Sequence, residues 1–466
     1  MNMLHYFPMR DLQKKNVVFR ARASLCCLTA CLLLLAACAG QPPKVNEEQN
    51  FPGEVQDIRQ IPQSLEWFAR QPGSGTAQDS SVLKSNAVSY LKKFFYPWDK
   101  RRSGSGDIAE LKRIYNWRED KRGFAENLQP WTAKAWQNLA ENADFAHFKG
   151  ICRPAITTHA TDLRLAPTIS PRFARITGAG QGYPFDDFQL SRLPVGLPVT
   201  VAHVSMDGAW FLVHSSLASG WVHAEHVGFA DEFLQSVWRS SDFYAFIKDE
   251  VPLSANGCFL GMAGIGTILP KDGENKVLVP ARGRNGAAEI ARVQLQDASA
   301  AEDFPLQFSR QRVAAIGDRM MGEKYGWGGL YGNRDCSATM KDLFCPFGIW
   351  LPRNSAAQAK AGEYHSLEHV PAAARDAAIL KNGLPFRTLV CMKGHIGLYA
   401  GAFQGKPVFF HNAWGLRNRL SDGRTGRVIL GRAVITGTRP GKERADMPED
   451  RLMIHNIRGL SIIGGR

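Results

Sequence analysis

The chain has 466 residues, of which 44% are hydrophobic and 21% charged; this composition is typical of folded proteins and excludes general disorder. The length exceeds what one hydrophobic core usually organises, so we expect several domains. The formal net charge of +14 points to nucleic acid, an anionic membrane or an anionic wall polymer as neighbour. Nucleic acid is the least supported of these three neighbours, because the sequence has no clustered basic runs, helix-turn-helix pattern or zinc-finger pattern.

The first 37 residues have the pattern of an export signal. Basic residues precede an apolar stretch, Leu25 to Ala37, which is too short to span a bilayer comfortably. It ends in Leu35-Ala36-Ala37-Cys38, which resembles the bacterial lipobox, where cleavage leaves an acylated cysteine at the new N-terminus. We predict a lipoprotein signal peptide over 1–37 and lipidation of Cys38. An ordinary signal cleavage beside an unrelated cysteine is the alternative.

Residues 38–60 are polar and contain several prolines, a composition that predicts a flexible tether rather than a core element. A tether fits a lipid anchor on a membrane. The residue after Cys38 is Ala39, not the aspartate associated with inner-membrane retention in many Gram-negative lipoproteins. We therefore expect the periplasmic face of the outer membrane as the location.

The middle of the chain changes from helical to strand-like patterning. From 61 to 150, Trp and Phe recur at helix-like spacing and predict a helical N-terminal domain. From 151 to 232, short strand-like pieces are separated by Gly, Pro and Asp, as around the turn Asp207-Gly208, and predict a small all-β barrel. The same texture over 233–303 predicts a second barrel.

The last part, 304–466, mixes both signals and predicts an α+β domain. An apolar-periodic stretch is followed by a glycine-rich turn, a helix, and strands at 388–399 and 407–414. The tail after about residue 439 is charged and rich in glycine, and we assign it no role.

One of the remaining cysteines stands where a nucleophile is expected. Past Cys38 there are five, an odd number that argues for at least one free thiol: Cys152, Cys258, Cys336, Cys345 and Cys391. Cys336 opens a predicted helix that stops before Pro346, with Asn333 or Asp335 as its N-cap. Because a helix N-terminus carries partial positive charge, we expect a lowered thiol pKa there.

The other two cysteines of the last domain have plainer interpretations. Cys345 lies at the predicted helix end, where the dipole is wrong for a thiolate, and Cys391 lies in a predicted strand. We interpret both as packing residues.

Two histidines are candidates for the base. If a hairpin turns symmetrically about Phe403, His395 faces His411 directly, and one imidazole can orient the other. Such a pair beside Cys336 would form a Cys-His-His relay of nucleophile, base and orienting group. Two strand histidines that align by chance are an equally open interpretation. A zinc site made of the same three side chains is a further one.

Several strings resemble a known family in their order and spacing. Four of them match the NlpC-type cell-wall cysteine peptidases: Tyr325-Gly326-Trp327-Gly328-Gly329, Asp335-Cys336-Ser337, Leu351-Pro352-Arg353-Asn354-Ser355-Ala356-Ala357-Gln358 and Gly394-His395-Ile396-Gly397-Leu398-Tyr399. The region 152–300 resembles the paired bacterial SH3-like domains of one branch, through strings such as Asp162-Leu163-Arg164. The string Ala125-Glu126-Asn127-Leu128-Gln129-Pro130 resembles that branch's helical N-terminal unit.

The resemblance implies a papain-like peptidase domain. Cys336 would attack, His395 would act as base and His411 would be the third member. Tyr325 would stand near the oxyanion together with the backbone N–H of Cys336, although an ordinary core aromatic is the alternative. We expect no cofactor and no metal, because no C-x-x-C pair or H-E-x-x-H string suggests a metal site.

The resemblance also implies the substrate, because the family cleaves the γ-D-glutamyl to diamino acid bond of peptidoglycan stem peptides. Asp335 and Ser337 would bind the free amine of an N-terminal L-alanine, while a plain helix cap is the alternative for Asp335. The family pattern has glycine after Cys-Ser, where this chain has Ala338. A second functional hypothesis is a non-catalytic wall-binding lipoprotein that works through its SH3-like domains.

Overall fold

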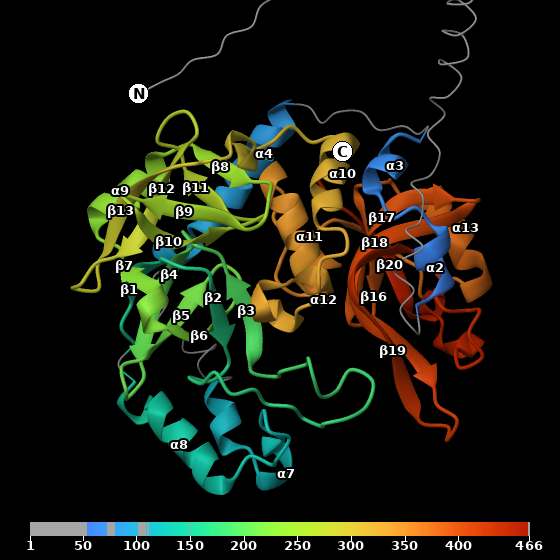
Figure 1. The fold of residues 1–466 in the computed structure, drawn as a ribbon, viewed down its shortest axis with the longest axis horizontal. Coiled ribbons are helices and arrows are strands. Elements are labelled where there is room, and N and C mark those ends of the chain that lie inside the picture. The colour runs from blue at the N-terminus through green and yellow to red at the C-terminus, as the bar shows by residue number, and fades with distance from the viewer. Residues whose placement is uncertain (1–53, 72–79, 101–108, 110, 149, 465–466) are drawn as a thin grey trace, which may run out of the picture. The chain divides into compact units, whose positions relative to one another are not determined.

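The computed structural model describes residues 54–71, 80–100, 109, 111–148 and 150–464. The predicted signal peptide, the predicted lipidation site Cys38 and most of the predicted tether lie outside these ranges. Within the described residues, no helix has both the length and the apolar character that crossing a membrane requires. Figure 1 shows the elements in chain order from blue to red.

Short helices make up the N-terminal part of the described chain. They are α2 (Gln56–Gln60), α3 (Leu65–Ala69), α4 (Ser80–Phe94), α5 (Tyr96–Asp99), α7 (Glu119–Arg122) and α8 (Ala133–Ala143). Helix α8 begins after Thr132, whose side chain accepts a hydrogen bond from the N–H of Ala135. Its buried Trp136 and Leu139 are three positions apart and therefore share one face. The predicted helical N-terminal unit is confirmed.

The first β unit is a seven-stranded antiparallel sheet in the order β3-β2-β6-β5-β4-β1-β7. Its strands are β1 (Arg153–Thr157), β2 (Thr161–Arg164), β3 (Gln189–Leu193), β4 (Pro198–Val204), β5 (Trp210–Ser215), β6 (Ser219–His223) and β7 (Val227–Phe229). The predicted turn Asp207-Gly208 joins β4 to β5. Helix α5 is fixed on this sheet, because the indole N–H of Trp98 donates to the carbonyls of Ala155 and Val199.

The second β unit follows helix α9 (Glu232–Ser240) and is built from three small sheets. Its strands are β8 (Phe243–Phe246), β9 (Val251–Ala255), β10 (Cys258–Ala263), β11 (Ile268–Pro270), β12 (Lys276–Arg282), β13 (Ala288–Gln294) and β14 (Ala301–Asp303). Strand β8 pairs with both β11 and β14, while β9 pairs with β10 and β12 with β13. The prediction of two consecutive β units is confirmed.

The C-terminal part has a six-stranded antiparallel sheet in the order β15-β20-β16-β17-β18-β19. The strands are β15 (Glu363–Ser366), β16 (Thr388–Met392), β17 (His395–Phe403), β18 (Lys406–Arg419), β19 (Thr425–Thr436) and β20 (Ile457–Ile462), and the helices are α10 (Arg310–Arg319), α11 (Cys336–Phe344), α12 (Ser355–Gln358) and α13 (Ala372–Asn382). Helix α11 packs against β17 and β18, and α13 packs against β18 (Figure 1). The predicted α+β architecture is confirmed.

Two sequence-based expectations for this sheet are corrected. The stretch 388–399 is not one strand but the hairpin β16–β17, which turns at Lys393-Gly394, where Gly394 has φ of +74°. A positive φ is a conformation that glycine adopts without strain. The tail, to which we assigned no role, supplies β20, which pairs with both β15 and β16. The segment 457–463 is itself rich in Ile and Leu, but the charged and glycine-rich composition of the tail as a whole concealed this strand signal.

The last residues of the predicted tether belong to the folded part. Val55 and Ile58, at the start and within α2, are buried, and α2 packs against β19. Both side chains enter the core that also contains residues of α13, β18 and β19. The tether prediction is therefore wrong for 54–60, because composition alone could not reveal that a distant sheet offers these apolar side chains a place to pack.

Candidate active site

Cys336 is the first residue of α11. The N-cap is Asp335, the second of the two residues we had considered, and its Oδ1 accepts a hydrogen bond of 2.8 Å from the N–H of Ala338. The helix ends at Phe344, before Pro346, as predicted. A carboxylate at this position satisfies one of the free N–H groups of the first turn and complements the helix dipole.

The expected lowering of the Cys336 pKa is wrong for this structure. The residue is only 8% exposed, and burial, assisted by the nearby Asp335 carboxylate, raises the pKa of the thiol to about 12. The backbone N–H groups of Ile396 and Ser337 favour the thiolate but do not outweigh burial. The helix N-terminus favours the thiolate form of Cys336. The free energy cost of burying a thiolate away from water is larger than this stabilisation. The substrate-free site holds a neutral thiol.

The two candidate histidines are in contact, although not by the register we expected. His395 Nε2 lies 2.7 Å from His411 Nδ1. The strands pair Leu398 with Phe410, and a bulge follows at Tyr399, so His395 and His411 are not directly opposed. A Cβ placed on Gly397 would lie 3.0 Å from the Cβ of His411. His395 therefore reaches His411 diagonally, past a glycine that leaves the space open.

A third group continues this chain of hydrogen bonds. The hydroxyl of Thr436, the last residue of β19, donates to the carbonyl of Gly437, and its oxygen lies 3.0 Å from His411 Nε2. Because the only hydroxyl proton is used, His411 Nε2–H donates to Thr436, and His411 Nδ1 accepts from His395 Nε2–H. His395 is thereby held in the tautomer with an unprotonated Nδ1, as a general base requires.

Both imidazoles are neutral in the substrate-free site. Burial lowers the pKa of His395 to about 4, although the Asp335 carboxylate opposes this. Burial, followed by the neighbouring His395, holds the pKa of His411 well below its usual value. Helix α11 packs on β17, and the N–H of Ile396 faces the Cys336 thiol, which places nucleophile and base side by side. Between these two described residues, no hydrogen bond joins Cys336 Sγ to the ring of His395.

Asp335 is held by an arginine that we did not single out. Arg353 donates from Nη2 to Asp335 Oδ2 at 2.7 Å and from Nη1 to Oδ1 at 3.1 Å, and Nη1 also donates to Ser337 Oγ at 3.0 Å. Burial would raise the pKa of Asp335, but Arg353 outweighs it and lowers the pKa. The N–H of Gly328 also donates to Asp335 Oδ2. Both carboxylate oxygens are therefore occupied.

Arg353 could have been noticed, because it lies in one of the quoted strings. The sequence around Arg353 does not, however, indicate which side chain it contacts. Only the fold brings it to Asp335. Its Nε donates to Ser191 Oγ of β3 at 2.8 Å, so the same guanidinium connects the first β unit to the start of α11.

The glycine-rich string at 325–329 makes a second connection to β3. Gln189 Nε2 donates to the carbonyl of Gly328 at 3.1 Å. Gly328 and Gly329 have φ of +60° and +93°, and a Cβ on them would lie 2.6 Å from Gln189 Cγ and 2.5 Å from Arg192 Cβ. Both glycines are needed, because the backbone conformation and the close approach of β3 each exclude a side chain.

A cavity of about 230 Å³ opens beside His395 and is also lined by Tyr325 and Trp327. Part of its wall comes from the first β unit, through Phe185 and other residues of the loop between β2 and β3. Trp327 Nε1 donates to the carbonyl of Asp186 in this loop at 3.0 Å. Burial, and then the nearby Cys336, raise the pKa of Tyr325, so its phenol stays protonated close to the nucleophile.

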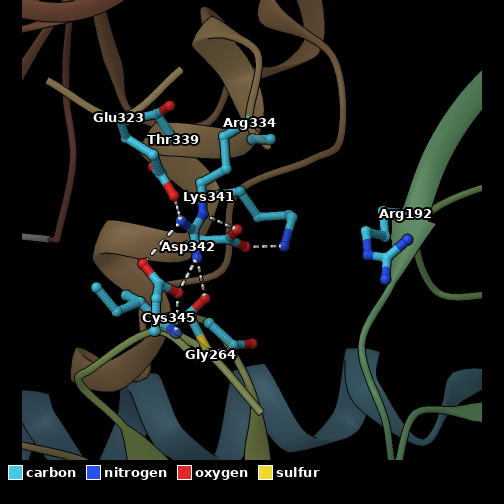
Figure 2. Close-up of polar contacts among 12 residues, drawn as sticks. Arg192, Gly264, Glu323, Arg334, Thr339, Lys341, Asp342 and Cys345 are labelled. Carbon is cyan, nitrogen blue, oxygen red and sulfur yellow. Dashed lines mark hydrogen bonds and ion pairs between the residues drawn. The ribbon is translucent and has the colours of Figure 1, made fainter. Parts of the chain in front are cut away.

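A buried ion cluster lies next to the cysteine in sequence. Arg334 donates to Asp342 of α11 and to Asp249 of the second β unit, each at 2.7 Å, and to Glu323 at 2.5 Å. Figure 2 shows Arg334 close to Asp342 and Glu323, with Arg192 farther away on another segment. Arg192 and the cluster line the same cavity of about 780 Å³. The cluster joins the second β unit to α11.

The other predicted sites have simpler surroundings. Cys345 is buried with its Sγ 2.9 Å from the Tyr90 hydroxyl, and Cys391 is buried in β16, as expected of packing residues. In the part of the chain that the structure describes, no group of three or more His, Cys, Asp or Glu side chains is arranged to hold a metal ion.

Comparison with family models identifies four consecutive domains. Residues 26–148 match the NLPC_P60 stabilising N-terminal domain, 171–223 match an SH3 domain of SH3b1 type, and 231–276 match an SH3 domain of SH3b2 type. Residues 322–423 match the NlpC/P60 family. These matches confirm the resemblance inferred from the sequence, including its helical domain and paired SH3-like domains. No curated protein matches the chain.

A solved structure shares the fold of this chain. An NlpC/P60 endopeptidase from Photobacterium damselae subsp. piscicida superimposes with a TM-score of 0.78 at 23% identity, covering 89% of this chain and 98% of its own. An NlpC/P60 family protein from Bacillus cereus has a TM-score of 0.43 at 16% identity, covering 66% of this chain and 98% of its own. At 23% identity the likeness to the Photobacterium enzyme shows the fold alone.

Proposed function

The chain carries an NlpC/P60 domain, a domain of cell-wall cysteine peptidases, behind its stabilising and two SH3 domains, and from this premise we propose that it hydrolyses peptidoglycan stem peptides. In this proposal Cys336 is the nucleophile, His395 the base, and the scissile bond joins γ-D-glutamate to the diamino acid. The main support is one observation: the chain Thr436–His411–His395 leaves a basic Nδ1 on the strand that packs against Cys336.

The first half of the reaction forms a thioester. His395 Nδ1 takes the proton from Cys336 Sγ as the sulfur attacks the carbonyl carbon of the γ-glutamyl amide. Because the free thiol and imidazole are both neutral, the proton moves during the attack and not before substrate arrives. The phenol of Tyr325 and the backbone N–H of Cys336 stabilise the oxyanion.

The second half releases both products. The imidazolium of His395 gives its proton to the leaving nitrogen, so the diamino acid departs as a free amine and the L-Ala-γ-D-Glu part stays on the sulfur. His395 Nδ1 then takes a proton from water, which attacks the thioester and regenerates Cys336. His411 and Thr436 keep the ring oriented throughout and do not touch the substrate.

The site of the N-terminal amine is a separate part of the proposal. Asp335 and Ser337 would receive the ammonium of L-alanine, and Asp335 carries a negative charge next to the nucleophile. In the substrate-free site Arg353 occupies both side chains. The ammonium must therefore share or replace these contacts, and the helix-cap interpretation already accounts for the carboxylate. Replacing L-alanine by its N-acetyl form tests this part, which fails if kcat/KM is unchanged.

The location is also proposed from the sequence. We propose that a lipid on Cys38 holds the protein at the periplasmic face of the outer membrane. Incorporation of labelled palmitate into the wild type, and none into Cys38→Ala, is the expected result, and labelling of both proteins would contradict it.

A direct assay tests the reaction and its nucleophile together. The purified protein is incubated with L-Ala-γ-D-Glu-meso-diaminopimelate, and the products are identified by mass spectrometry. We expect release of L-Ala-γ-D-Glu by the wild type and no detectable release by Cys336→Ala, because no other group can form the acyl-enzyme. Cys391→Ala removes a buried thiol of β16 and serves as the matched control that stays active.

Two other outcomes separate the alternatives. If the wild type cleaves no stem peptide but still binds peptidoglycan, the SH3 domains carry the function and the wall-binding hypothesis replaces this one. If a chelator such as EDTA stops cleavage while iodoacetamide does not, the zinc interpretation of Cys336, His395 and His411 replaces the thiol mechanism.

A further inference from the structure

The last member of the hydrogen-bond chain stands at the end of an edge strand. Thr436 ends β19, and β19 is the outermost strand of the order β15-β20-β16-β17-β18-β19, so it has a strand partner on one side only. The end of an edge strand frays unless other groups bond its free N–H and C=O groups. A fixed position matters here, because the hydroxyl of Thr436 sets the tautomer of His411 and, through it, that of His395.

Gln63 takes the place of the missing strand beside Thr436. Its Nε2 donates to the carbonyl of Ile435 at 2.8 Å, and its Oε1 accepts from the N–H of Ile435 at 2.9 Å. One side-chain amide thus makes both bonds that a neighbouring antiparallel strand would make to this residue. The same Nε2 also donates to the carbonyl of Ile61 at 3.0 Å, which fixes the amide on its own segment.

Asp57 bonds the residue on the other side of Thr436. Its Oδ2 accepts from the N–H of Gly437 at 2.8 Å. The carbonyl of the same Gly437 accepts from the Thr436 hydroxyl at 3.0 Å, which leaves the hydroxyl oxygen to accept from His411. Asp57 therefore holds the residue that directs the hydroxyl proton of Thr436 away from the imidazole, while Gln63 holds the residue before it.

The segment that carries both side chains is fixed to the C-terminal part by other contacts. Helix α2 packs on β19, and α3 packs on β17 and α10 (Figure 1). The carboxylate of Asp318 on α10 accepts from the Ser64 hydroxyl at 2.8 Å and from the Glu66 N–H at 3.0 Å. Gln63 and Asp57 therefore reach the end of β19 from a fixed base.

We propose that Gln63 and Asp57 are positioning residues of the peptidase: they hold the end of β19 so that Thr436 keeps the two imidazoles in the working tautomer. This inference rests on the proposed function. It extends the support of the base to a segment 372 and 380 residues earlier in the chain. A catalytic domain without this segment would keep its nucleophile and both histidines but would lose control of their tautomers.

Steady-state cleavage of L-Ala-γ-D-Glu-meso-diaminopimelate by the purified protein is the first test. Gln63→Ala removes both bonds to Ile435, and we expect kcat to fall by about threefold or more with KM little changed, the effect of losing an ordinary hydrogen bond. Asp57→Ala should lower kcat in the same way, and it keeps the test open if the first variant folds poorly. Asp57→Asn keeps an oxygen for the Gly437 N–H and should restore kcat.

A double variant shows whether Gln63 acts through Thr436. Because Thr436→Val already releases His411, adding Gln63→Ala to it should cause no further loss of kcat. Ser64→Ala is the matched control, since it removes a hydrogen bond of 2.8 Å from the same segment to α10 without touching β19. It should lower the melting temperature but leave kcat unchanged.

The ring nitrogens of the histidines give a readout that needs no substrate. In ¹⁵N NMR of histidine-labelled protein, His411 of the wild type should have a protonated Nε2 and an unprotonated Nδ1. Gln63→Ala should shift His411 toward the other tautomer, and Ser64→Ala should not.

The outcomes separate the two claims. Unchanged kcat and unchanged ring signals in Gln63→Ala and Asp57→Ala would overturn the inference and leave the proposed function standing. Losses of kcat that multiply in the double variant would show an effect that Thr436 does not carry, and would also overturn it. A wild type that cleaves no stem peptide would overturn the proposed function, and the ring signals alone would then decide the positioning role.

Discussion

Burial, rather than the helix dipole, decides the charge state of the reacting pair. The Cys336 thiol has its pKa raised to about 12 and the His395 imidazole has its pKa lowered to about 4, so each group is neutral between these values. A neutral pair costs less to bury than a thiolate and an imidazolium. The substrate-free site therefore contains no buried thiolate–imidazolium pair.

Alkylation kinetics test this charge state. Only the thiolate reacts, and below its pKa the thiolate fraction rises roughly tenfold for each pH unit. We therefore expect iodoacetamide to label Cys336 slowly at pH 7.5 and faster as the pH rises to 9. Peptide mapping follows each cysteine, and the exposed Cys258 is an internal comparison that should react first. Labelling of Cys336 ahead of Cys258, with no dependence on pH, would show a stable thiolate–imidazolium pair instead.

Three neighbouring strands hold the base in its working form. His395 begins β17, His411 lies within β18 and Thr436 ends β19, so the hydrogen-bond chain runs across the sheet from strand to strand. The end of β19 is fixed from outside the sheet, because the amide of Gln63 bonds both the N–H and the carbonyl of Ile435. Thr436 is a positioning residue, since it acts on His395 only through His411.

Substitution of Thr436 tests this arrangement. Thr436→Val keeps the shape but removes the acceptor for His411 Nε2–H, so His411 can adopt the other tautomer and stop accepting from His395. We expect kcat to fall about tenfold or more with KM little changed, by analogy with loss of tautomer control in the serine-protease triad. Thr436→Ser restores the hydroxyl and should restore kcat. A purely structural role would instead lower the melting temperature of the valine variant with no loss of kcat in the folded protein.

Arg334 is one of the side chains that connect the C-terminal domain to the second β unit, together with Arg319, which donates to the carbonyl of Ile247. Arg334 is buried, contacts three carboxylates and donates to the carbonyl of Ile265 in the second β unit. The amide of Asn412, next to His411, donates to the backbone carbonyl of Arg334. The ion cluster thus connects a neighbouring domain to the segment that presents Cys336.

Removal of this arginine should destabilise the whole molecule. Arg334→Met leaves Asp249, Glu323 and Asp342 without their shared cation, which we expect to lower the free energy of unfolding by about 3 kcal/mol. Urea unfolding followed by tryptophan fluorescence measures it. The control is Arg312→Met, which breaks an exposed ion pair with Glu302 and should cost less than about 1 kcal/mol. Similar losses for both variants would show that the buried cluster adds nothing.

The sequence alone determined the order of the domains and the local geometry around Cys336. A helix that starts at this residue, capped by Asp335 and ended before Pro346, follows from rules that act over a few residues. The alternation of apolar residues in the strands placed the two histidines on the same face of the sheet, because every second residue of a strand points to one face. These are properties of neighbours in the chain, and they were predicted correctly.

Only the tertiary structure decided the rest, because it depends on distances between segments that no local pattern fixes. The β17–β18 hairpin turns at Gln404-Gly405, between the paired Phe403 and Lys406, and not about Phe403, so the histidine register differs from the expected one. Burial reversed the expected pKa of Cys336. The contact of Arg353 with Asp335 spans 18 residues, and the bond from the same guanidinium to Ser191 forms only because the first β unit packs against the C-terminal domain. The cavity beside His395 likewise exists only where the β16–β17 turn, β18, β19 and the tail meet, since residues far apart in the sequence line one cavity only when folding brings them together.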